Sequence, residues 1–215
     1  MSALPNKLMS LPAHPSGLVG RLFGKLMEWT NADAYRKALQ ALAPSDNERF
    51  LEIGFGTGCC AEMLLSTTTG TFATGVDPTE TMVKTASDRL IRKGLGDRID
   101  LRQGTDELLP WDDNQFDAIV AIHCFQFWQD PDRSIREIDR VLRLHGRIII
   151  IFRDHSTKAP DWLPNPLSRS VREIELAVSL LEKHRYLCTE HPSAGSSRII
   201  RAVRKASPKE NRLTK

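Results

Sequence analysis

The chain has 215 residues, of which 40% are hydrophobic and 27% are charged. Its 30 basic residues nearly balance its 27 acidic ones, and the resulting net charge of +3 does not indicate a nucleic-acid-binding protein. This length suits one globular domain. No uninterrupted apolar run approaches the roughly 18 residues that a membrane-spanning helix needs.

The four cysteines have no spacing typical of a zinc site or of a disulfide framework. We therefore expect reduced thiols, no bound metal and a cytoplasmic location. The beginning of the chain lacks the basic and then apolar pattern of a secretory signal, which agrees with that location. The last ten residues, 206–215, are rich in Ser, Pro, Asn and Lys, and we expect a flexible tail there rather than an RNA-binding arm.

The first 45 residues form a separate unit in this interpretation. Residues 1–15 contain three prolines and predict an extended arm. Apolar residues then recur at helical spacing over 17–29, with charged residues opposite them, which predicts an amphipathic helix. A second short helix is predicted over 32–42, ending before Pro44.

Strands and helices alternate over 46–205, which predicts one doubly wound α/β domain with a mostly parallel, seven-stranded sheet. The last two strands follow each other closely and predict a hairpin that adds an antiparallel strand at the sheet edge. Strands are expected at 49–53, 71–77, 98–103, 117–123, 146–153, 186–191 and 198–204, and helices at 57–66, 80–93, 131–143 and 168–184.

The most informative segment is FLEIGFGTG, at 50–58, which predicts a short strand followed by a glycine loop and a helix start. Such a loop lets a nucleotide-like ligand approach the backbone closely. Its GxGxG spacing differs from the G-x-G-x-x-G of dinucleotide-binding proteins. Glu52 would repel a pyrophosphate but attract an ammonium group, which favours S-adenosylmethionine (SAM) over NAD. Asp77 ends the next strand, where either ligand needs an acid for its ribose hydroxyls.

Together, FLEIGFGTG, GVDPTETMV and RVLRLHGRIIII resemble the class I, seven-stranded SAM-dependent methyltransferases. The resemblance is to the small-molecule enzymes of the ubiquinone and menaquinone biosynthesis type, and it covers roughly residues 49–153. It implies a Rossmann-like methyltransferase fold, SAM as the cofactor and S-adenosylhomocysteine as the product. It also implies that the extra N-terminal helices form a lid over the substrate cavity.

The resemblance places the cofactor at the carboxyl ends of the strands. It makes Glu52 the holder of the SAM amino end and Asp77 the acceptor for the ribose diol. Relatives often carry an acid where this chain has Thr105, so the group that contacts the adenine amino group is left open between Asp106 and backbone atoms. The cofactor-binding residues expected on this basis are Glu52, Gly54, Phe55, Gly56, Gly58, Asp77, Pro78, Met82, Thr105, Asp106 and His123.

Substrate contacts are expected from the loops after the fourth and fifth strands. His123 is a candidate general base, because imidazole titrates near neutrality, or else a hydrogen-bonded histidine at a strand end. Phe127 and Trp128 either shape a substrate pocket or belong to the core. Arg153 either pairs with a substrate carboxylate or with its neighbour in the chain, and His155 lies in the same loop.

The sequence thus predicts an enzyme that transfers a methyl group to a small-molecule acceptor. The alternatives are a SAM-binding regulatory protein without transfer activity and an RNA methyltransferase. The Asn-Pro-Pro-aromatic pattern of enzymes that methylate exocyclic amines does not follow the fourth strand. The helix over 17–29 has few cations, so we favour a lid that covers an apolar acceptor over a helix that lies on a membrane.

Overall fold

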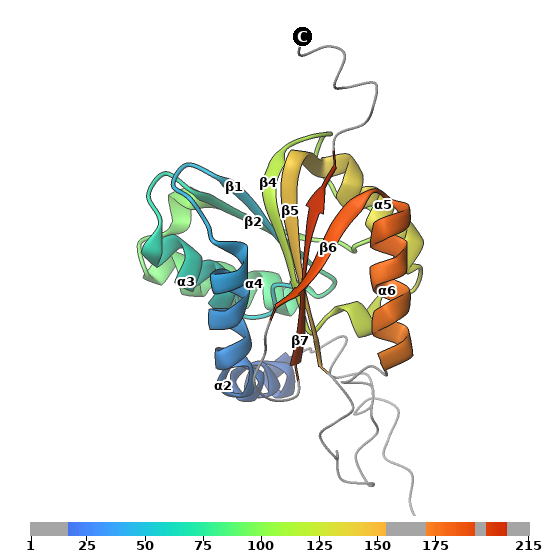
Figure 1. Cartoon of the computed structure of the whole chain (residues 1–215). Helices are drawn as coiled ribbons and strands as arrows, with labels where there is room; N and C mark the ends of the chain where they lie inside the picture. The colour runs from blue at the N-terminus through green and yellow to red at the C-terminus, as the bar shows by residue number, and fades with distance from the viewer. Residues whose placement is uncertain (1–16, 154–170, 192–196, 206–215) are drawn as a thin grey trace, which may run out of the picture.

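The structure is a computed structural model that describes residues 17–153, 171–191 and 197–205. Of residues 17–27, 29, 30, 153, 172 and 173 it describes the backbone only. The seven strands form one sheet in the order β3-β2-β1-β4-β5-β7-β6 (Figure 1). They are β1 (Arg49–Ile53), β2 (Phe72–Asp77), β3 (Ile99–Gln103), β4 (Phe116–Ile122), β5 (Leu142–Arg153), β6 (Tyr186–His191) and β7 (Ser197–Arg204).

Helices cover both faces of the sheet, as expected for a doubly wound fold. One layer holds α2, α3 and α4, and the other holds α5 and α6 (Figure 1). The central strand β5 is apolar on both faces, and its residues 148–152 are at most 1% exposed. The helices are α2 (Gly17–Leu42), α3 (Cys59–Thr67), α4 (Glu80–Arg92), α5 (Pro131–Val141) and α6 (Val171–Lys183), with short 3₁₀ turns η1 (Gly96–Arg98) and η2 (Phe125–Phe127).

The sheet is mostly parallel with an antiparallel last strand, which confirms the predicted fold class. The expected position of that strand was wrong. β7 lies inside the sheet, antiparallel to both β5 and β6, and β6 forms the edge. The side chains explain this order, because Ile199, Ile200 and Ala202 of β7 are buried whereas Leu187 of β6 is 54% exposed.

The two N-terminal helices expected from the sequence are joined in one 26-residue helix, α2. Its first turns run across the carboxyl ends of the strands, and the remainder runs along the sheet (Figure 1). Asn31 does not favour helix, but it is buried and hydrogen-bonded, so tertiary contacts override its weak propensity. Ala38 and Leu42 belong to the same core as β1 and α3. The predicted division of the chain near residue 45 stays a prediction.

The transition from α5 to β5 also differs from expectation. The sequence predicted a helix to residue 143 and a strand from 146, but α5 ends at Val141 and β5 begins at the next residue. The register of β5 against β4 then shifts between Phe116 and Ala118, and His145 adopts a positive φ of 64°. Among the described helices, none is both long enough and apolar enough to cross a membrane.

Candidate functional site

The glycine loop between β1 and α3 has a backbone that other residues adopt only with strain. Gly54, Gly56 and Gly58 have φ values of 71°, 54° and 78°. A Cβ on Gly54 would lie 2.8 Å from the Cβ of Cys124, and one on Gly58 would lie 2.9 Å from that of Ala86. A Cβ on Gly56 would meet nothing within 4 Å. Two of the glycines are thus needed for packing, and the third leaves open space beside the backbone.

Asp77 connects the end of β2 to this loop. Its side chain is 6% exposed, and its Oδ2 accepts a hydrogen bond of 3.0 Å from the Gly56 N–H. Its Oδ1 accepts from the Thr79 N–H at 3.0 Å and from the Thr79 hydroxyl at 2.9 Å. Thr79 occupies the N-cap position of α4 but makes no capping bond with its side chain. The carboxylate expected to bind ribose is therefore also the group that holds the glycine loop in place.

Glu52 is a buried acid with an unsatisfied oxygen. Its side chain is 3% exposed, and its Oε2 has no hydrogen-bond partner among the residues that the structure describes. Burial raises the pKa of Glu52 well above its usual range, and the nearby Asp77 carboxylate raises it further. A cation bound beside these two acids would stabilise both negative charges. The residues present thus fit the ammonium and sulfonium groups of SAM.

The residues expected near adenine differ in how deeply they are buried. Phe55 and Met82 are buried together with Ala86 in a small apolar cluster, so both have a packing role. Pro78 is partly buried between Asp77 and Thr79 and accepts a hydrogen bond from the Gln103 side chain. Whether these residues also contact a cofactor stays a prediction.

The loop after β3 carries Thr105 and Asp106, and which of its groups contacts adenine stays a prediction. Thr105 is exposed, and Asp106 accepts a hydrogen bond from the Ser134 hydroxyl of α5. Burial raises the pKa of Asp106, while the Ser134 contact opposes that shift. The Gly104 N–H donates to the Asp77 carbonyl at 3.0 Å, which brings this loop beside the acid that is expected to bind ribose.

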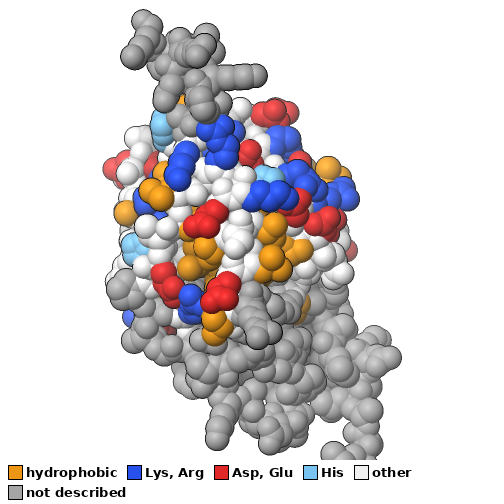
Figure 2. Space-filling view, turned by 45° about the vertical axis from the view of Figure 1, so that its right-hand side comes forward, with side chains coloured by type: hydrophobic (Ala, Val, Ile, Leu, Met, Phe, Trp, Pro, Cys, Tyr) orange, Lys and Arg blue, Asp and Glu red, His pale blue; other side chains and the backbone are white. Residues whose placement is uncertain are grey.

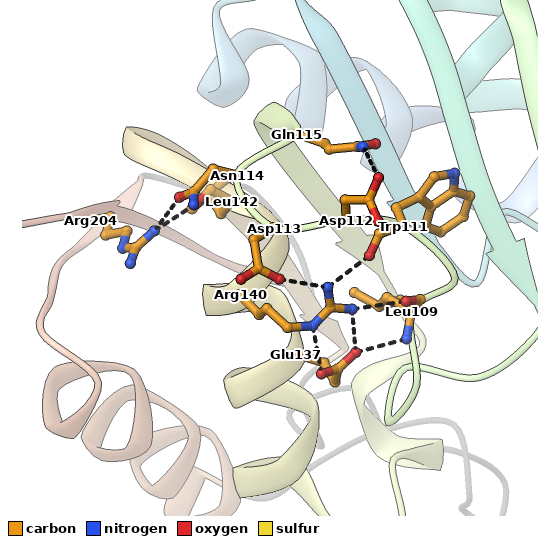
Figure 3. Close-up of polar contacts among 10 residues, drawn as sticks. All are labelled: Leu109, Trp111, Asp112, Asp113, Asn114, Gln115, Glu137, Arg140, Leu142 and Arg204. Atoms are coloured by element: carbon orange, nitrogen blue, oxygen red, sulfur yellow. Dashed lines mark hydrogen bonds and ion pairs between the residues drawn. The ribbon is translucent and has the colours of Figure 1, made fainter.

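Further along, the same loop is braced by Arg140 of α5 (Figure 3). The guanidinium donates to the carbonyls of Leu109 and Trp111, at 2.9 and 2.7 Å, and to the Asp113 carboxylate at 3.0 Å. Glu137 accepts two bonds from Arg140 and one of 3.0 Å from the Leu109 N–H. The contact with Arg140 lowers the pKa of Glu137. This brace positions the loop on which Thr105 and Asp106 lie.

His123 directly follows β4 and contacts three other elements, β5, α2 and β7. It is 9% exposed and has a φ of 50°, and its N–H donates to the Ile151 carbonyl at 2.9 Å. Its Nδ1 lies 3.1 Å from Oδ1 of Asn31 in α2, and its Nε2 lies 3.5 Å from Oγ of Ser197 in β7. His123 thus has hydrogen bonds at a strand end, which was one of the two alternatives given by the sequence. Its role as a base stays a prediction.

The aromatic residues after β4 lie mainly in the core. Trp128 is 7% exposed, and its ring centroid lies 5.0 Å from that of Phe125, which in turn lies 5.0 Å from that of Phe152. Phe127 is partly buried. The side chain of Arg153 and all of His155 lie outside the described residues, so their predicted substrate contacts stay predictions.

Sequence reasoning missed the contributions of α2 to the site. Asn31 contacts His123, and a side-chain hydrogen bond joins Asn31 to Tyr35. Burial raises the pKa of Tyr35, and the charge of Glu52 adds to the shift. A polar residue within the buried stretch of a helix was the available signal. In the part of the chain that the structure describes, no group of three or more His, Cys, Asp or Glu residues is placed to hold a metal ion.

The comparison with protein families decides the class of this site. The family described as "Methyltransferase domain" matches residues 51–150, from the strand of the glycine loop to the middle of β5. Residues 51–150 therefore match a methyltransferase domain, which bears out the resemblance to the class I SAM-dependent methyltransferases. SAM is accordingly the cofactor of this domain.

Individual relatives agree with the family. An uncharacterized methyltransferase of Bacillus subtilis, YdaC, is 26% identical over 136 residues, which cover 63% of this chain and 73% of YdaC. A demethylmenaquinone methyltransferase of Bacteroides fragilis is 27% identical over 60% of this chain and 51% of its own length. The crystal structure of a SAM-dependent methyltransferase from Aquifex aeolicus superposes with a TM-score of 0.66 at 20% identity, covering 79% of this chain and 88% of that one.

The match covers only part of several other curated relatives. The chain spans 40% of the length of one such relative and 57% of another. The similarity therefore concerns the cofactor-binding domain. The superposed structure shares the fold, and its low sequence identity carries no statement about the acceptor.

Proposed function

We propose that the protein transfers the methyl group of SAM to a small-molecule acceptor. The observation that carries the proposal is the buried Glu52 carboxylate, whose Oε2 has no hydrogen-bond partner among the described residues. The acid lies beside Asp77 and next to a glycine loop whose Gly56 leaves open space. An anionic cofactor tail would be repelled by this pair, whereas a ligand with an ammonium group supplies the charge that it lacks.

The positions of the other residues support the same ligand. Asp77 and the loop at Gly104 meet at the carboxyl ends of neighbouring parallel strands, β2 and β3. Ligands of open α/β sheets bind at this edge, next to the change of strand order between β1 and β4. SAM supplies a methyl group that its sulfonium has already made electrophilic. The chain needs only to bind the acceptor in line with that methyl group and to exclude water.

A small acceptor is favoured over RNA by the distribution of charge. On the face that carries α6, basic and acidic side chains are interspersed and do not gather in one basic band (Figure 2). Many are paired there, among them Lys183 with Asp132, Arg204 with Asp139 and Arg198 with Glu190. Paired cations offer little to a phosphate backbone.

The first half of α2 supports a covered acceptor site. It crosses the carboxyl ends of the strands (Figure 1), and Glu28 anchors it to Arg89 of α4 at 2.8 Å. Arg89 also pairs with Glu62 of α3. A helix held by an ion pair at this position fits the proposed lid. The side chains of the apolar stripe over 17–27 lie outside those that the structure describes.

Two measurements test the proposal. Calorimetric titration of SAM and of S-adenosylhomocysteine should give micromolar binding, and replacing Asp77 by Ala should weaken it at least tenfold, or by about 1.4 kcal/mol. Transfer from methyl-tritiated SAM is then measured with a panel of small acceptors. Demethylmenaquinol comes first, as the reduced form of the compound in the name of the Bacteroides fragilis relative. Binding without transfer to any member of a broad panel would favour a regulatory SAM-binding protein.

A further inference from the structure

Two acidic side chains attach the loop after β3 to the beginning of α5. Asp106 accepts a hydrogen bond from the hydroxyl of Ser134, which is 0% exposed, and the same hydroxyl lies 3.0 Å from the carbonyl oxygen of Asp130. Glu107 accepts a bond of 3.2 Å from the Asp130 N–H and lies 3.6 Å from the Arg133 guanidinium. Both neighbouring acids of the loop are therefore engaged with α5.

The beginning of a helix favours acids of this kind. Asp130 is the N-cap of α5, and its carboxylate accepts from the Arg133 N–H at 3.1 Å. The N–H groups of the first turn and the positive end of the helix dipole stabilise further negative charge beside them. Burial raises the pKa of Asp106, and the bond from Ser134 opposes that shift, so this contact offsets part of the cost of burying the carboxylate.

The same loop lies at the edge of the sheet where the cofactor is expected. The Gly104 N–H donates to the Asp77 carbonyl at the carboxyl ends of β3 and β2, where ligands of open α/β sheets bind. Asp106 follows Gly104 by two residues, so its attachment to α5 sets the path of the backbone beside this edge. Arg140, from the same helix, holds the far part of the loop through the Leu109 carbonyl at 2.9 Å. The helix α5 thus fixes the loop at two separate points.

We infer that Asp106 is a positioning residue that acts through Ser134. The pair fixes the loop after β3 on α5, and other groups of that loop recognise the adenine of the cofactor. The inference rests on the proposed function, because it takes this loop to face SAM. It assigns the Asp106 carboxylate to a contact within the protein and not to the adenine amino group. Removing the carboxylate therefore weakens cofactor binding without changing which base the site prefers.

The experiment separates recognition of the base from positioning of the loop. Calorimetry measures the dissociation constants of S-adenosylhomocysteine and of its hypoxanthine counterpart, in which an oxygen replaces the amino group of the base. The full-length variants are Asp106→Ala, Ser134→Ala and the double variant. Asp106→Asn is the conservative replacement, because its amide can still bond to the Ser134 hydroxyl. Asp112→Ala is the matched control, since this acid lies further along the same connection and bonds to the Gln115 side chain at 3.2 Å.

The two single alanine variants should weaken binding of S-adenosylhomocysteine by up to about tenfold each, the effect of one hydrogen bond to a charged group. The double variant should bind as weakly as the weaker single variant and no more weakly, since all three lose the same interaction. Asp106→Asn and Asp112→Ala should stay within about twofold of the wild type. The ratio of the two dissociation constants should be the same in every variant and in the wild type.

Two binding results would overturn the inference. The first is a ratio that falls in Asp106→Ala but not in Ser134→Ala, because it would show that the carboxylate itself recognises the amino group. The second is a double variant whose loss equals the sum of the two single losses in free energy, because the side chains would then act independently.

Hydrogen exchange in the ligand-free protein gives a readout that needs no cofactor. Asp106→Ala and Ser134→Ala should speed exchange of residues 105–109 to the same extent, and the double variant no further. Unchanged exchange in either single variant would also overturn the inference. Absence of S-adenosylhomocysteine binding by the wild type would refute the proposed function, while hydrogen exchange would still decide whether the two side chains act as a pair. Thermal melts of every variant distinguish a loosened loop from an unfolded protein.

Discussion

The raised pKa of Glu52 makes SAM binding depend on pH in a defined direction. In the free protein, burial and the Asp77 charge oppose ionisation of the side chain and hold its pKa well above its usual range. A bound ammonium group favours the carboxylate, so binding must release the proton to solvent. The dissociation constant should therefore fall as pH rises, until the pH passes the pKa of Glu52 in the free protein.

The size of the effect follows from linkage. Each pH unit below that pKa changes the affinity by up to tenfold, about 1.4 kcal/mol. Measurement between pH 5 and 7 keeps the SAM α-amino group charged, since such groups titrate near about 7.7–8.0. The expected change across this interval is up to about 100-fold, because one group titrates.

Calorimetry in two buffers that differ in ionisation enthalpy counts the released protons. The wild type should release protons on binding SAM at pH 6, and Glu52→Gln should release none and bind with little pH dependence. Asp77→Asn is the matched control, because it weakens binding but leaves the buried Glu52 as a source of protons, with a smaller release because the Asp77 charge no longer raises the pKa of Glu52. Binding by the wild type without proton release, or equal release by Glu52→Gln, would refute the reasoning.

Four further outcomes are expected. Glu52→Gln should raise the melting temperature at neutral pH. The pKa of Glu52 is higher in the folded protein than in the unfolded chain, so stability is lost as pH rises above the unfolded pKa of about 4.3. A wild-type melting temperature that does not change between pH 4 and 7 would contradict this. Gly56→Ala should lower the stability by roughly 1 kcal/mol and should remove most of the SAM affinity. Gly58→Ala should have a much lower melting temperature, because its Cβ meets Ala86. Arg140→Leu should weaken SAM binding and speed hydrogen exchange in the loop after β3. Arg89→Leu should speed hydrogen exchange in the first half of α2 and leave hydrogen exchange in the loop after β3 unchanged.

Much of the fold was predictable because each element carries its own local pattern. The seven strands lie within a few residues of their expected positions, since apolar runs and the glycine loop mark them independently of tertiary context. The order of β6 and β7 was not predictable in this way. Which of two adjacent strands is inserted beside β5 depends on side chains that pair across about 50 residues, such as Ile150 with Ile200.

The candidate site was also predictable only in part. Asp77 and the glycines could be named from their spacing, but the bond from the Gly56 N–H to Asp77 depends on how two loops meet. The partner of Asp106 was equally hidden, because Ser134 lies 28 residues further on and gives no sign of its role. Asn31 falls between the two helices expected over 17–29 and 32–42, and its contact with His123 depends on tertiary structure.

The inserted position of β7 determines when the protein can become functional during synthesis. β7 is hydrogen-bonded to β5 on one side and to β6 on the other, and it also brings Ser197 to His123. A nascent chain that has emerged only as far as β6 has no partner for that strand and leaves the edge of β5 unpaired, which is a template for aggregation. Ribosomal release of β7 should therefore close the sheet and complete the site in one step, so chains stalled before residue 197 should depend on chaperones.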